Sequence, residues 1–71
     1  MPKSDYIQVE GVIIDSVRDT FTVRLENGTV ITAHPAGKLR IHNIRLLTGD
    51  PVTVELSVYD LTKGRIVFRH K

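Results

Sequence analysis

Residues 21–33 of the chain read Phe-Thr-Val-Arg-Leu-Glu-Asn-Gly-Thr-Val-Ile-Thr-Ala. In the first half of this stretch apolar and polar side chains alternate, which is the period of a β-strand with one buried face. Asn27-Gly28 then supplies a pair of residues that tolerate positive φ in a two-residue hairpin turn. Residues 29–33 form the returning strand. The stretch therefore predicts a β-hairpin within an all-β domain.

A further strand precedes this hairpin. Ile7, Val9 and Ile13 share one face of the alternation, and Gly11 interrupts it. A glycine inside a strand often marks a bulge or a bend where a sheet curls over on itself. We therefore expect a bulge or bend at Gly11.

Two more strands follow near the end of the chain. Residues 52–58 alternate cleanly, and residues 62–64, Thr-Lys-Gly, are expected to turn the chain back. In the last strand Ile66 and Phe68 share the inward phase, so Phe68 is expected in the core and Arg69 on the outer face.

The alternation fails between His34 and Gly49. Residues 36–43 allow one or two helical turns, with Leu39 and either Ile41 or Ile44 facing the core. The predicted order is three strands, a short helix and two strands. That is the order of the OB-fold, a five-stranded Greek-key barrel with one short helix between strands 3 and 4.

Length and composition agree with this prediction. Seventy-one residues form one small domain, 1–71, in which we expect residues 1–5 to be flexible. The chain has no cysteine, which excludes disulfides, thiolate zinc sites and a cysteine nucleophile, and fits a reducing compartment. We expect the protein in the cytoplasm. We see no export signal, and the longest aliphatic run, residues 12–14, is far too short to span a membrane. No membrane partner is expected.

The charge is unevenly distributed. Three cations face five anions up to residue 33, and seven cations face three anions after it. The basic residues form two groups, residues 38–45 and 63–71, and neither group contains an acid. A polyanionic partner is one interpretation and an ordinary solvated surface is the other. We expect Arg40 and Arg45 to have no acid within reach and to serve binding, not folding.

Catalytic and cofactor chemistry find little support. His34, His42 and Asp50 are the only conceivable metal or acid/base cluster, and their spacing matches no ligand motif. Gly37-Lys38 lacks the upstream glycine and the hydroxyl residue of a phosphate-binding loop. We therefore expect neither an enzyme, nor a metal site, nor a cofactor.

Aromatic residues are scarce. Tyr59 ends its strand, where it is either a tyrosine of the barrel rim or a base-stacking residue. Few stacking surfaces and many cations favour recognition of folded RNA by its shape and backbone.

The residues also resemble a known family. Residues 33–34, 37–40, 44–50, 54–56 and 59–66, together with Leu25-Glu26-Asn27-Gly28, closely resemble the bacterial translation initiation factor one family. Some positions depart from the residues usual in that family, and the turn at residues 17–20 is about one residue shorter. These departures are Thr22, Ala36, Leu39, Asn43 and Val58.

The resemblance implies an OB-fold protein of the cytoplasm, monomeric and without enzymatic activity. It implies binding to ribosomal RNA at the aminoacyl site of the small ribosomal subunit, beside a ribosomal protein of the decoding centre. There such a protein blocks premature binding of tRNA and assists the second and third initiation factors. The RNA-binding residues implied are His34, Lys38, Arg40, Arg45, Tyr59, Lys63, Arg65 and Arg69. The alternatives are a free-standing RNA chaperone on unstructured RNA and a protein-interaction module that does not use its basic groups.

Overall fold

The computed structural model describes residues 6–42 and 45–70. The elements follow the predicted order of three strands, a helix and two strands. They are β1 (Tyr6–Val17), β2 (Thr20–Leu25), β3 (Val30–Pro35), α1 (Gly37–Ile41), β4 (Pro51–Ser57) and β5 (Asp60–Arg69).

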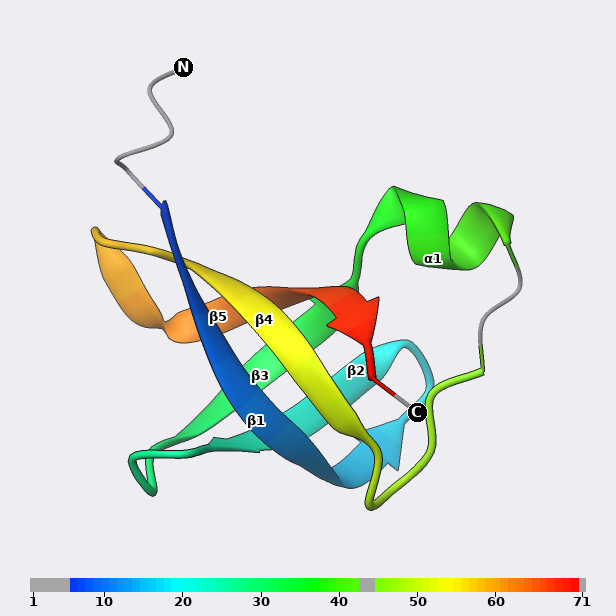
Figure 1. The fold of residues 1–71 in the computed structure, drawn as a ribbon, viewed down its shortest axis with the longest axis horizontal. Helices are drawn as coiled ribbons and strands as arrows, with labels where there is room; N and C mark the ends of the chain where they lie inside the picture. Colours follow the sequence, from blue (N-terminus) through cyan, green and yellow to red (C-terminus); the bar gives the residue numbers. More distant parts are fainter. Residues whose placement is uncertain (1–5, 43–44, 71) are drawn as a thin grey trace.

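The strands form a closed barrel in the order β1-β2-β3-β5-β4 (Figure 1). The pairing of β4 with β1 closes it. Closure depends on the length of β1, whose first half pairs with β4 and whose second half pairs with β2. Gly11 and Val12 pair with both neighbours. The β3 and β5 strands run parallel, and the other pairs are antiparallel. This topology confirms the predicted OB-fold.

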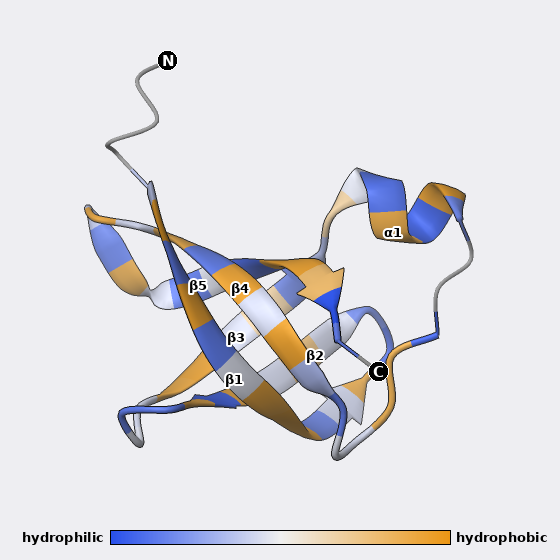
Figure 2. Ribbon diagram, in the orientation of Figure 1, coloured by the Kyte–Doolittle hydropathy of each residue, from blue (hydrophilic) through white to orange (hydrophobic). Residues whose placement is uncertain are grey.

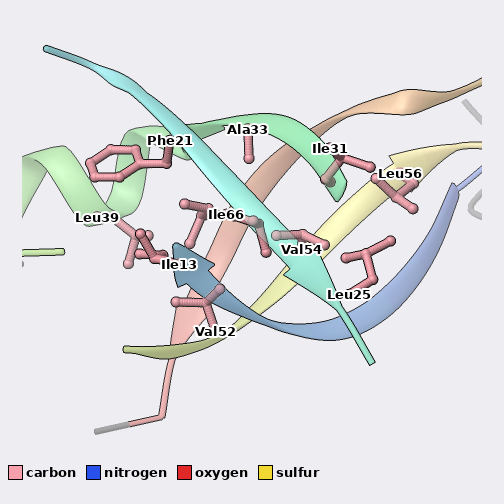
Figure 3. Close-up of a cluster of buried hydrophobic side chains, with 11 residues drawn as sticks. Ile13, Phe21, Leu25, Ile31, Ala33, Leu39, Val52, Val54, Leu56 and Ile66 are labelled. Atoms are coloured by element: carbon pink, nitrogen blue, oxygen red, sulfur yellow. The ribbon is translucent and has the colours of Figure 1, made fainter. Parts of the chain in front are cut away.

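The core lies inside the barrel, where the inward phases of the strands meet. Hydrophobic and hydrophilic residues alternate along the strands in Figure 2. Leu39 enters the core from α1 beyond the end of β3, as predicted. Ile41 is 77% exposed, so of the two alternatives for a second core residue Ile41 is wrong. Ile44 lies outside the described residues. The buried cluster, drawn in Figure 3 with every member except Val23 labelled, consists of Ile13, Phe21, Val23, Leu25, Ile31, Ala33, Leu39, Val52, Val54, Leu56 and Ile66.

The bulge in β1 lies three residues beyond Gly11. The register with β2 shifts between Ile13 and Asp15, which leaves Ile14 as the extra residue. At Gly11 the ladder is regular, so the expected bulge at that position is wrong. Gly11 is needed instead for close packing: a Cβ there would lie 2.7 Å from Val23 Cγ1 and 2.9 Å from the carbonyl oxygen of Arg24.

A second bulge lies in β5. Val54 pairs with Ile66, but Thr53 pairs with Phe68, so Val67 is the extra residue. One extra residue reverses the alternation of every side chain after it. Ile66 is buried as predicted, whereas Phe68 is 53% exposed and Arg69 is turned inward. The expected core position of Phe68 and the expected outward position of Arg69 are both wrong for this reason.

The turn between β4 and β5 comes earlier than predicted. Ser57 pairs with Asp60, so the chain reverses at residues 58–59, and residues 62–64 already belong to β5. The Ser57 hydroxyl accepts a hydrogen bond from the Tyr59 N–H, and Asp60 accepts from both the N–H and the hydroxyl of Thr62. These bonds to Thr62 lower the pKa of Asp60, with a smaller contribution from Lys63. Local side-chain bonds of this kind favour a turn at their own position.

The β2–β3 hairpin has a three-residue loop instead of the expected two-residue loop. The Gly28 N–H donates to the Leu25 carbonyl (2.8 Å), and the Leu25 N–H donates to the Thr29 carbonyl (2.7 Å). Gly28 has φ +91°, whereas Arg18 is the one non-glycine residue with positive φ among residues 6–42 and 45–70. The expected positive φ at Asn27 is therefore wrong. Only Gly28 has the left-handed conformation of this loop type.

Replacing Gly28 by valine is expected to destabilise the protein by about 1–2 kcal/mol, because a β-branched residue is strained at positive φ. A Cβ at this position would meet nothing within 4 Å, so the expected loss comes from the backbone conformation and not from a collision of the Cβ. Thermal unfolding measures the effect. Gly28→Asn is the control, because asparagine tolerates this conformation, and it should lose clearly less. Equal melting temperatures for the parent protein, Gly28→Val and Gly28→Asn would contradict a loop in which Gly28 has positive φ.

Candidate nucleic-acid interface

Three of the predicted RNA-binding residues meet on the outside of the barrel. The parallel ladder of β3 and β5 pairs His34 with Arg65 and Thr32 with Lys63. The side chains of His34, Lys63 and Arg65 are exposed and line one open hollow of about 380 Å³. Residues 29 to 31 positions apart in the chain thus form one patch, which we call the sheet patch (His34, Lys63 and Arg65).

The charges of the sheet patch are only partly compensated. Arg65 Nη2 donates to Glu55 Oε1 on β4 at 2.9 Å, and the Arg65 side chain is still 56% exposed. No ion pair is recorded for Lys63 in the described part of the chain. His34 Nε2 lies 3.4 Å from the Thr20 hydroxyl. Exposed cations fixed on strands suit contacts with a phosphate backbone.

A second basic group surrounds α1. Lys38 and Arg40 lie on the helix, and Arg45 lies in the connection to β4. Arg40 and Arg45 line one hollow together with Asp19 from the β1–β2 turn. Arg40 Nη2 is 3.9 Å from Asp19 Oδ2, so the expectation that no acid is within reach of Arg40 is wrong. Because both side chains are largely exposed, this pair holds Arg40 only weakly.

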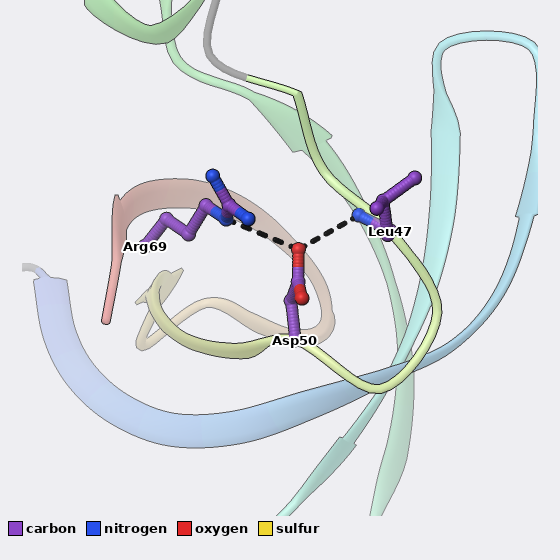
Figure 4. A network of polar contacts seen from close by, with 3 residues as sticks. All are labelled: Leu47, Asp50 and Arg69. Atoms are coloured by element: carbon purple, nitrogen blue, oxygen red, sulfur yellow. Dashed lines mark hydrogen bonds and ion pairs between the residues drawn. The ribbon is translucent and has the colours of Figure 1, made fainter. Parts of the chain in front are cut away.

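Arg69 is placed differently from the other cations. Its Nε donates to Asp50 Oδ2 at 3.1 Å, and the same oxygen accepts the Leu47 N–H at 2.9 Å (Figure 4). The Asp50 side chain is 1% exposed and that of Arg69 25%. Asp50 therefore fixes Arg69 and joins the loop before β4 to the end of β5. An RNA contact of Arg69 remains a prediction.

Tyr59 lies in the β4–β5 turn, far along the barrel from α1 (Figure 1). Its side chain is 82% exposed, and no hydrogen bond of its hydroxyl is recorded within the described ranges. Tyr59 is therefore accessible to a partner, and a stacking role stays a prediction.

The comparisons with known proteins identify one family for this chain. The family model of translation initiation factor 1A / IF-1 matches residues 1–71. The solution structure of translation initiation factor IF-1 from the Wolbachia endosymbiont strain TRS of Brugia malayi is 40% identical, with a TM-score of 0.78, over 94% of this chain and 80% of that one. The chain belongs to the translation initiation factor 1A / IF-1 family. Factors of this family are non-enzymatic and bind the ribosome.

Two larger proteins share the fold alone. YjeQ from Thermotoga maritima is 23% identical, with a TM-score of 0.76, over 92% of this chain and 23% of that protein. YloQ, a circularly permuted GTPase, is 22% identical, with a TM-score of 0.78, over 100% of this chain and 25% of that protein. The same barrel therefore also forms part of longer chains.

The segments that resemble the IF-1 family occupy defined places in the barrel. Residues 37–40 form most of α1, and the Thr48-Gly49-Asp50 turn carries the buried carboxylate. Gly64 lies where a Cβ would come 2.7 Å from Leu56 Cδ2. Family resemblance thus rests partly on residues that the fold needs and partly on the exposed cations.

The structure also places His34 and Asp50, two residues of the metal or acid/base cluster considered in the sequence. Within residues 6–42 and 45–70, no cluster of three or more His, Cys, Asp or Glu residues could hold a metal ion. Asp50 is bonded to Arg69, and His34 lies on the outer face of β3. No helix in this part of the chain is long and apolar enough to cross a membrane.

Sequence reasoning missed one exposed aromatic residue, Phe68. The alternation of residues along the strand predicted an inward side chain at Phe68, because it gave no sign of the bulge at Val67. Phe68 adds to the exposed side chains beside α1, where it lines a hollow with Lys38 and His42.

Proposed function

We propose that this initiation factor binds ribosomal RNA at the aminoacyl site of the small ribosomal subunit, beside a ribosomal protein of the decoding centre. It blocks premature binding of tRNA there and assists the second and third initiation factors, as a monomer in the cytoplasm. The observation that carries the proposal is the sheet patch, which the parallel β3–β5 ladder assembles on a rigid barrel.

The arrangement of the cations suits a folded RNA target. The sheet patch lies along β3 and β5, and Lys38 lies on α1, which follows β3 (Figure 1). Arg40 and Arg45 share a hollow with Pro35 at the end of β3. Two separated basic groups can contact phosphates on different parts of one folded RNA. A target that is already folded loses little conformational entropy on binding, so each contact contributes more net affinity.

A competition experiment tests the proposal. Labelled protein is bound to purified small subunits at fixed salt and challenged with a tRNA directed to the aminoacyl site, or with unstructured RNA. We expect the tRNA to displace the protein and unstructured RNA to do so only at far higher concentration. If unstructured RNA displaces the protein readily and the tRNA has no effect, the result would support the RNA chaperone instead.

Replacing Lys63 by alanine is expected to weaken binding to small subunits and to reduce the slope of log affinity against log salt by roughly one unit, because one phosphate contact is lost. Binding measured between low and moderate salt gives both quantities.

Arg24→Ala is the matched control for this measurement. Arg24 is an exposed cation on β2 that lines a different hollow, which Glu10 and Glu26 also line. Its removal should leave the salt slope unchanged, and both variants should unfold at the temperature of the parent protein. A slope equally reduced in both variants would mean that net charge matters and the sheet patch does not.

A further inference from the structure

The ring of Phe68 is exposed but held in place. The centre of the Phe68 ring lies 4.9 Å from the centre of the His70 ring, and the planes of the two rings are inclined to each other by 60°. Single exposed apolar residues are common on protein surfaces, so exposure alone indicates nothing. The surroundings of the ring distinguish this residue.

His70 is held by contacts with two neighbouring strands, β1 and β4. Its Nε2 lies 2.8 Å from Glu10 Oε1 on β1 and 2.6 Å from the Thr53 hydroxyl on β4. The Thr53 hydroxyl donates to Glu10 Oε2 at 2.6 Å, and the His70 N–H donates to the Pro51 carbonyl at 3.0 Å. The His70 ring is thus immobilised and limits the orientations open to Phe68.

The exposed side of Phe68 borders a cationic hollow. The hollow has a volume of about 180 Å³ and lies between α1 and β5, lined by Phe68, Val67, Leu39, Lys38, His42 and Arg69. None of these lining residues is an acid. Lys38 is exposed, with no ion pair recorded in the ranges that the structure describes.

An aromatic face beside an unpaired cation suits one chemical class of ligand. A nucleobase stacks on the ring, and its phosphate meets the ammonium group. A basic protein segment would be repelled by the cations of the hollow. An acidic segment could pair with Lys38, but its carboxylates would not stack on the ring of Phe68. The pre-oriented ring loses little entropy when a base stacks on it.

We propose that Phe68 is a stacking platform for an unpaired nucleobase of the RNA target, with Lys38 contacting the adjacent phosphate and His70 acting as a positioning residue for the ring. The proposal rests on the proposed function, because it specifies one contact within that RNA interface. It places an aromatic contact beside α1, at the opposite end of the barrel from Tyr59.

The test compares Phe68→Leu with Phe68→Tyr on purified small subunits. Leucine keeps an apolar side chain, and tyrosine keeps the stacking face. We expect about tenfold weaker binding for Phe68→Leu and near-parental binding for Phe68→Tyr. Chemical modification of unpaired bases provides the second readout. At least one base protected by the parent and by Phe68→Tyr should become reactive with Phe68→Leu, at protein concentrations that saturate the subunits.

The positioning role of His70 is tested by a double-mutant cycle. His70→Ala should weaken binding and expose the same base in the parent background, but add little in the Phe68→Leu background, because the ring it orients is gone. A purely structural role would weaken binding equally in both backgrounds. Thermal unfolding of each variant confirms that the barrel is intact.

The outcomes separate this proposal from the proposed function. If the parent protein fails to bind small subunits, the proposed function fails first. If the parent binds and Phe68→Leu binds equally well with unchanged base protection, the stacking platform is wrong while the function stands. Cross-linking to the small subunit gives a third readout. If Phe68→Leu binds weakly and loses a cross-link to a ribosomal protein, while its base protection equals that of the parent, Phe68 contacts protein and the nucleobase proposal is overturned.

Discussion

Replacing Asp50 by alanine is expected to destabilise the barrel by about 3 kcal/mol, because breaking a buried ion pair leaves the remaining partner uncompensated. The change removes the acceptor of the Arg69 Nε–H and of the Leu47 N–H at once. We place the value at the lower end of the range for buried pairs, since the Arg69 side chain is 25% exposed and water can reach it. Urea denaturation measures the loss.

Asp19→Ala is the matched control for this prediction. Asp19 also pairs with an arginine, but at 3.9 Å and with 79% of its side chain exposed. Its loss should change stability by less than about 1 kcal/mol. If Asp50→Ala fails to fold, Asp50→Asn keeps an acceptor for the Leu47 N–H and gives a measurable intermediate value. Equal effects of Asp50→Ala and Asp19→Ala would show that the buried pair contributes nothing special.

Gly11→Ala is expected to cost about 3 kcal/mol. The added Cβ would collide with the Arg24 carbonyl oxygen at 2.9 Å, and that oxygen belongs to the backbone of the neighbouring strand, which cannot move without disturbing the ladder. β1 pairs on both sides at this residue, so a displacement on one side strains the other. The change in the urea midpoint measures the cost.

Two other glycines calibrate the Gly11 prediction. At Gly64 the collisions under 3.3 Å are with the ends of the Leu56 and Ile31 side chains, which can rotate away, so Gly64→Ala should cost only about 1 kcal/mol. At Gly37 nothing lies within 4 Å, and alanine favours the helix, so Gly37→Ala should be neutral or slightly stabilising. Equal costs at Gly11 and Gly37 would contradict the assigned packing.

The sequence determined the elements whose signals are local. The alternation in residues 21–25 and 52–56 is a property of neighbouring residues, and both segments form strands with the predicted faces buried. Leu39 is the apolar residue that a short helix there needs, and Gly28 has the positive φ that its loop requires. The order of these elements was sufficient to predict the OB-fold, and the exposed cations and the family resemblance were sufficient to predict an initiation factor.

Only the tertiary structure decided features that depend on how the barrel closes. Strands in a closed barrel must stagger, and an extra residue at Ile14 and at Val67 provides the shift in register. Nothing in the local alternation shows where such a residue falls, so Phe68 points out and Arg69 points toward Asp50, contrary to the sequence prediction.

The candidate site shows the same division. The sequence identified His34, Lys63 and Arg65 as separate candidate residues, but their arrangement side by side follows from the parallel pairing of β3 with β5, two strands that are distant in the chain. Non-local pairing depends on the free energy of the whole barrel, which no short stretch of residues encodes. The amino-acid sequence therefore determined which side chains are available for RNA, and the closure of the barrel decided which of them share one surface.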